Sequence, residues 1–133
     1  MSVTVCVGVQ GPQGIPGPSG SAIGSVTAVV ASTLLTLAQA STLFNNTGAQ
    51  GEVDLSLPAA PSPFTPFSFS MFVTTAQTFS FVAPSGVTIQ NGSDSSSPGG
   101  SISSNVVGNF VTISCVSSTL WIVTNVTGLW NLA

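Results

Sequence analysis

The chain has 133 residues, with no lysine, arginine or histidine, and its three acidic residues give a net charge of −3. Without cations to neutralise phosphates, it is not expected to bind nucleic acids or anionic membrane surfaces. Catalysis by a histidine base or a lysine Schiff base is excluded, as is a zinc site built from histidine and cysteine ligands of one chain. We therefore expect a non-enzymatic protein that contacts neutral surfaces and needs no cofactor.

Hydrophobic residues make up 43% of the chain and charged residues 2%, so a single copy would have little charge to keep it in solution. Oligomerisation, or docking onto a larger body, would cover the excess apolar surface. The longest apolar stretch, residues 28–38, is interrupted by Ser32, Thr33 and Thr36, so it falls short of the 18 or more apolar residues of a membrane-spanning helix. A membrane is therefore not an expected partner.

Residues 2–7 alternate polar and apolar side chains, which predicts a short β-strand with Val3, Val5 and Val7 on one face. This strand has no neighbour nearby in its own chain. It would therefore pair with a sheet of the other subunits or of the surface that carries the protein. We predict that residues 1–7 are an anchoring strand and that these three valines attach the protein to a capsid.

A collagen-like register follows the strand. Glycine occupies every third position, and prolines fill several positions between, at Pro12, Pro16 and Pro18; the glycines are Gly8, Gly11, Gly14, Gly17 and Gly20. Three polyproline-II chains wind together only with glycine at the crowded axis, so the register predicts a homotrimeric stalk over residues 8–24, with a flexible linker as the alternative. The triplets end where Ile23 stands in place of a glycine.

Residues 25–133 predict an all-β head domain. Short runs rich in β-branched and aromatic residues alternate with turns rich in Pro, Gly, Asn and Ser, which favours an antiparallel β-sandwich of jelly-roll type or a barrel. The expected strands are residues 26–31, 33–37, 53–57, 67–73, 78–82, 87–89, 101–103, 109–116, 120–125 and a short one near Leu129. Helix is expected only as a turn over residues 37–41. The aromatic residues of 67–71 and 79–81 share one face at period two, as in a sandwich core.

Two pairs of residues are candidates for chemistry. Glu52 and Asp54 lie two apart at the start of a strand and should share a face. They would form a solvated strand end, a pair of glycosidase carboxylates, or part of a cation site shared by three subunits. Cys6 and Cys115 are predicted to be buried free thiols, with a disulfide between stalk and head as the alternative.

The order of motifs in the head resembles the recurring head-domain pattern of tailed-bacteriophage fibre and decoration proteins. The resemblance covers residues 33–131, about three quarters of the chain. The segments that carry it are LTL at 35–37, TLFNNTGA at 42–49, VDLSLPA at 53–59, FSFSMFV at 67–73, PSGVTI at 84–89, GNFVTI at 108–113, LWIV at 120–123 and GLW at 128–130. It implies a trimeric β-sandwich head on a stalk. The basic and tyrosine residues common in such heads are missing here.

The resemblance and the stalk together suggest two functions. The first is a homotrimeric capsid decoration or head-fibre protein on the outer surface of a virion, held by the major capsid protein or another virion protein. The second is the receptor-binding tip of a tail fibre that recognises a host-surface glycan. A stalk of five triplets would extend only about 45 Å at roughly 3 Å per residue, which favours the first.

Overall fold

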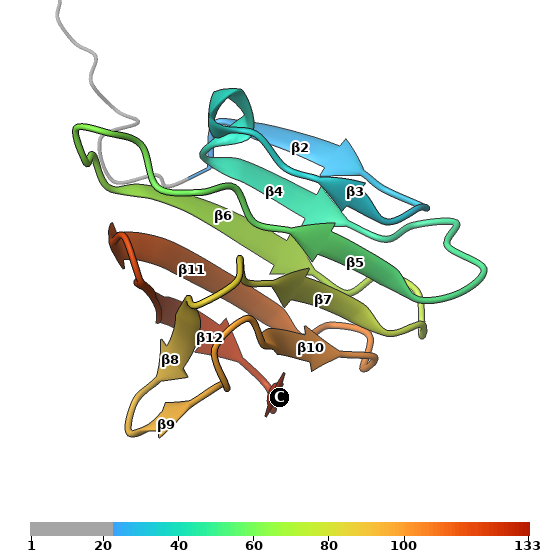
Figure 1. The fold of residues 1–133 in the computed structure, drawn as a ribbon. Coiled ribbons are helices and arrows are strands. Elements are labelled where there is room, and N and C mark those ends of the chain that lie inside the picture. The colour runs from blue at the N-terminus through green and yellow to red at the C-terminus, as the bar shows by residue number, and fades with distance from the viewer. Residues whose placement is uncertain (1–22) are drawn as a thin grey trace, which may run out of the picture.

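The structure, a computed structural model, describes residues 23–133 and shows an all-β sandwich of two sheets (Figure 1). Seven strands form the larger sheet. In spatial order they are β2 (Ser25–Ala28), β4 (Thr42–Asn45), β6 (Phe67–Phe72), β11 (Phe110–Ser117), β12 (Leu120–Thr127), β8 (Thr88–Asn91) and β9 (Asp94–Ser95).

Five strands form the smaller sheet. In spatial order they are β13 (Asn131–Leu132), β10 (Ser101–Ser104), β7 (Phe79–Val82), β5 (Val53–Ser56) and β3 (Thr33–Leu34). One turn of 3-10 helix (Leu37–Gln39) follows β3, where the sequence predicts a turn. Among residues 23–133 no helix is long and apolar enough to cross a membrane.

The first six described strands form a flattened coil. The chain passes from β2 in the larger sheet to β3 in the smaller one, returns to β4, and continues in the same way through β5, β6 and β7. Each passage reverses the chain direction, so strands of the same sheet run parallel: β2 with β4, β4 with β6, β3 with β5, and β5 with β7. We call β2, β3 and the residues between them the first coil (residues 25–34).

The β-sandwich expected from the sequence is confirmed, but its sheets are mixed, so the expectation of antiparallel pairing throughout, as in a jelly roll, is wrong. Of ten pairings in the described chain, five are parallel and five antiparallel. The physical reason for four of the five parallel pairs is the coil, because strands next to each other in sequence lie in opposite sheets; the fifth joins β8 and β12. After the coil, β10 and β11 close the sandwich by antiparallel pairing with β7 and β6.

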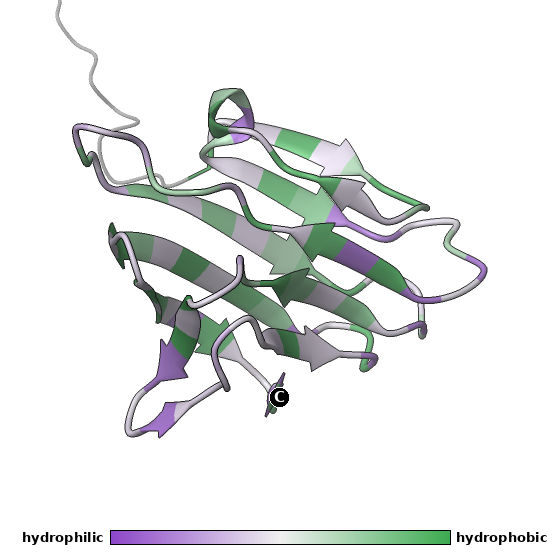
Figure 2. Ribbon diagram, in the orientation of Figure 1, coloured by the Kyte–Doolittle hydropathy of each residue, from purple (hydrophilic) through white to green (hydrophobic). Residues whose placement is uncertain are grey.

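The core lies between the sheets and confirms the aromatic pattern predicted from the sequence. In β6 and β7, Phe69, Met71, Phe79 and Phe81 are fully buried. Phe69 stacks on Trp121 of β12 with ring centroids 6.0 Å apart. Burial of each such side chain contributes about 1.5–3 kcal/mol, so this cluster is a major source of the stability of the head. Figure 2 shows the alternation of apolar and polar residues along the strands.

Candidate functional site: an apolar, uncharged edge

The predicted anchor and stalk residues lie outside the described part of the chain. These are Val3, Val5 and Val7 of the anchoring strand, the axial glycines Gly8, Gly11, Gly14, Gly17 and Gly20, and Cys6. Their roles stay predictions. The described chain begins at Ile23, and the amide of Gly24 already donates a hydrogen bond to the carbonyl of Ser41 in the head.

The structure brings Glu52 and Asp54 together, as their spacing predicts. The protonated Glu52 carboxyl can hydrogen-bond to Asp54, and this interaction, followed by the charge of Asp54 and slight burial, raises the pKa of Glu52 above its ordinary value. Asp54 also belongs to the fold: its amide donates to Ser32 Oγ at 2.8 Å, and its carboxylate accepts a hydrogen bond from Ser80 Oγ.

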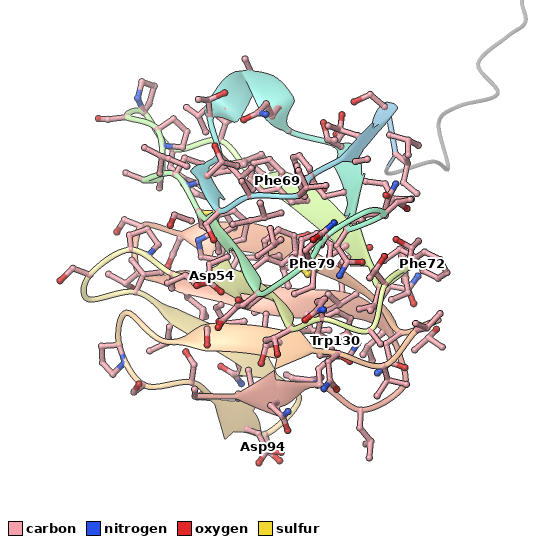
Figure 3. All side chains as sticks on the ribbon, turned by 90° about the vertical axis from the view of Figure 1, so that its right-hand side faces the viewer. Asp54, Phe69, Phe72, Phe79, Asp94 and Trp130 are labelled. Carbon is pink, nitrogen blue, oxygen red and sulfur yellow. The ribbon has the colours of Figure 1, made fainter. Side chains whose placement is uncertain are left out.

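The described chain supplies no third acidic, histidine or cysteine side chain beside this pair to complete a metal site. Across residues 23–133 there is no group of three or more His, Cys, Asp or Glu side chains that could hold a metal. Asp94, the remaining acid, lies at the far end of the sandwich (Figure 3). The described surface also has no cavity in which a substrate could be enclosed. Within one chain Asp54 ties the β2–β3 connection to β7 through its bonds to Ser32 and Ser80.

Cys115 confirms the prediction of a buried free thiol. It lies on β11, its Sγ donates a hydrogen bond to the carbonyl of Ser117 at 3.2 Å, and burial raises the pKa of the thiol. A raised pKa keeps the sulfur protonated and unreactive. Its role is therefore that of a small apolar core residue.

The most unusual surface of the described chain is the first coil. On its two strands the side chains reverse the usual sandwich pattern of apolar inside and polar outside, whereas Val29 in the connection packs against the core. Thr27 pairs with the buried Phe44 and therefore faces inward, whereas Val26 pairs with Leu43 and faces outward. On the other sheet Thr33 pairs with the buried Leu55 and faces inward, so Leu34 faces outward.

The outward apolar side chains of the first coil are largely exposed. Val26 is 64% exposed, Val30 in the connection 59%, and Leu34 67%. Because β2 and β3 belong to different sheets, Val26 and Leu34 point away from opposite faces of the sandwich. The connection between the two strands is also mostly apolar, with Val29, Val30 and Ala31 ahead of Ser32 (Figure 2).

The first coil forms one whole edge of the molecule. In the described chain β2 ends one sheet and β3 ends the other, and both lie at the top of Figure 1, where they are uncovered. All four residues of β2 and both residues of β3 are exposed. Exposed apolar edge strands are sites where chains associate, and natural proteins usually protect them with charge. Here there is no charged residue before Glu52.

Sequence reasoning predicted strands at these positions and missed the surface that they form. The inward and outward faces of β2 and β3 depend on their pairing with β4 and β5, and the pairing of β2 required a strand that was not predicted. One signal was available: the absence of charge over the first 51 residues. An ordinary solvated edge would carry at least some charged side chains.

A second apolar surface lies on the other half of the sandwich. Val106 and Val107, in the loop between β10 and β11, are 56% and 57% exposed, and Leu129, which follows β12, is 92% exposed. Asn109 holds this region together, because its Nδ2 donates to Ser104 Oγ at 2.9 Å and to the Leu129 carbonyl at 3.0 Å.

No protein-family model matches this chain, and a search of curated proteins finds none that is detectably similar to it in sequence.

Proposed function

We propose that the protein is a homotrimeric structural component of a virion, a capsid decoration or head-fibre protein. In this proposal residues 1–7 attach to the major capsid protein or to another virion protein. Residues 8–24 form a short triple-helical stalk, and the β-sandwich head projects from the outer surface of the capsid. The protein acts as a scaffold without catalysis, cofactor, nucleic acid or membrane.

One observation carries the proposal: a five-triplet glycine register stands directly ahead of a β-sandwich whose first coil is apolar on the outside. Five triplets form a weak triple helix, so three chains need a second region to hold them in register. The apolar first coil, adjoining the end of the register, supports such a role. The resemblance of residues 33–131 to phage head domains points to the same class of protein.

Two measurements test the proposal. Light scattering of the purified full chain should give about 40 kDa, three times the 13.2 kDa of one chain. Electron microscopy of intact particles, with and without the protein, should then show trimeric density on the capsid shell that the deletion removes. Density at the tail tip would instead support a receptor-binding tip that recognises a glycan. A monomer would contradict both functions.

A further inference from the structure

The exposed apolar side chains on the outside of the first coil indicate the chemistry of the surface that covers them. Val26 projects from the larger sheet and Leu34 from the smaller one, each about two thirds exposed, and the inner positions of the two strands hold only serine and threonine. A coil end that met only water would carry polar side chains on its outside. The covering surface must therefore be apolar and uncharged.

The position of the first coil identifies the covering molecule as another copy of this chain. The coil begins two residues after Ile23, where the glycine register ends. In a triple helix the three chains lie side by side, so their first coils emerge close to a common axis. No charge in the first 51 residues opposes their approach.

The N-terminal strand of the same chain is a poorer candidate. Its valines are also apolar, but a stalk of fifteen residues between them and the head would hold them about 45 Å away. The capsid, at the far end of that stalk, is held away by the same distance.

We propose that three copies pack around the stalk axis through their first coils, with the β2 side of each copy against the β3 side of the next. This inference rests on the proposed trimer and names its interface. A three-fold axis creates heterologous contacts, in which one surface of a subunit meets a different surface of its neighbour. Val26 and Leu34 suit this geometry because they lie at the same edge of the sandwich, one on the outer face of each sheet.

Disulfide trapping tests this pairing directly. Two full-length chains, both carrying Cys6→Ser, would be co-expressed with different tags, one with Val26→Cys and the other with Leu34→Cys. After oxidation, a non-reducing gel should show a covalent dimer that contains both tags. Each variant expressed alone should give no covalent dimer, because position 26 meets position 34 and not itself. Val106→Cys paired with Leu34→Cys is the matched control and should not cross-link.

A second measurement asks whether the contact stabilises the trimer. Val26→Ser with Leu34→Ser should raise the concentration at which full-length trimers dissociate by on the order of a hundredfold, since two exposed apolar side chains per subunit lose their burial. Val106→Ser with Val107→Ser changes side chains of similar exposure elsewhere and should leave that concentration unchanged. Circular dichroism of each variant checks that the head is folded.

The outcomes separate the interface from the trimer itself. A wild-type chain that is monomeric overturns the proposed function. A wild-type trimer that gives no cross-link between positions 26 and 34 overturns only the interface. Cross-linking of either variant with itself overturns the β2-to-β3 pairing. If the two double-serine variants dissociate at the same concentration, the first coil does not hold the copies together.

Discussion

Asn46 is a buried polar side chain that links the loop after β4 to the loop after β6. It follows β4 and is fully buried. Its Oδ1 accepts hydrogen bonds from the amides of Thr74 and Thr75, each at 2.9 Å, and its Nδ2 donates to the Thr75 carbonyl at 2.9 Å. The loop after β6 thus obtains from a side chain the hydrogen bonds that its backbone cannot make within a sheet.

Replacing Asn46 with alanine should destabilise the head by about 3 kcal/mol, because it leaves buried amides and a carbonyl of the β6–β7 loop without partners. Chemical denaturation, followed by tryptophan fluorescence, measures the loss. Asn125→Ala, at an exposed position on β12, is the control and should change stability little. Equal stability of the two variants would contradict the role of Asn46.

The Glu52–Asp54 pair predicts a pH dependence of stability. The neighbouring Asp54 raises the pKa of Glu52, so the folded protein holds the Glu52 proton more tightly than the unfolded chain does. The stability from this proton is present below the ordinary pKa of 4.5 and is lost as the pH rises through the raised value. At neutral pH the two carboxylates repel each other.

Glu52→Gln should therefore raise the melting temperature at pH 7 and have a smaller effect at pH 4. Thermal unfolding at both pH values measures the difference between variant and wild type. Asp94→Asn, which removes an exposed acid from the far end of the sandwich, is the control for net charge. If both variants stabilise the protein equally at pH 7, net charge explains the effect and the pair does not.

Individual strands were predictable where the local pattern is strong. Residues 67–70 alternate phenylalanine and serine side chains within an apolar segment that continues to Val73, and the structure confirms β6 there. Two short strands were missed: β4, and β9 within a loop rich in Ser and Gly. β4 has only four residues and is defined by its parallel neighbours β2 and β6, which local propensity does not reveal.

The arrangement of strands was less predictable than their existence. Alternation along a strand gives its two faces but does not say in which sheet the next strand lies. The head uses connections that cross from sheet to sheet, so parallel pairs form between strands far apart in sequence. For the same reason the candidate interface was hidden, because the outward direction of Val26 follows from its pairing with Leu43.

The predicted stalk can be tested apart from the head. Gly14→Val places a side chain at the crowded axis of the expected triple helix, where it cannot fit, while the head buries its own core. We expect the stalk to be disrupted locally and the β signal of the head to persist. Circular dichroism reports the head and electron microscopy the stalk. Loss of both together would mean that the stalk is not an independent module.

In the proposed role, attachment to the capsid should depend on apolar contact and hardly on charge. Replacing Val3, Val5 and Val7 with serine should greatly weaken attachment, since each valine contributes on the order of 1.5 kcal/mol when buried and three copies act together. Particles that lack the protein would be mixed with wild-type or variant trimers at low and high ionic strength, and the occupancy counted.

Wild-type occupancy should be nearly independent of salt, because the N-terminal residues carry no charged side chain. Normal occupancy by the triple-serine variant would show that the head is the docking surface. A collapse of wild-type binding in modest salt would show that charge drives attachment.

The coiled path of the chain also orders the folding of the head in time. Only nearby segments pair quickly, and the tight hairpin of β11 and β12, where Ser117 pairs with Leu120, is such a segment. The parallel pairs of the coil form only after long loops close, which is slower. The first coil, moreover, pairs with a neighbouring strand on one side only. We therefore expect the first part of the head to be synthesised to be the last to become protected. Amides of β2 and β3 should exchange with deuterium faster than those of β6 and β11 in dilute protein, and should slow when the copies meet.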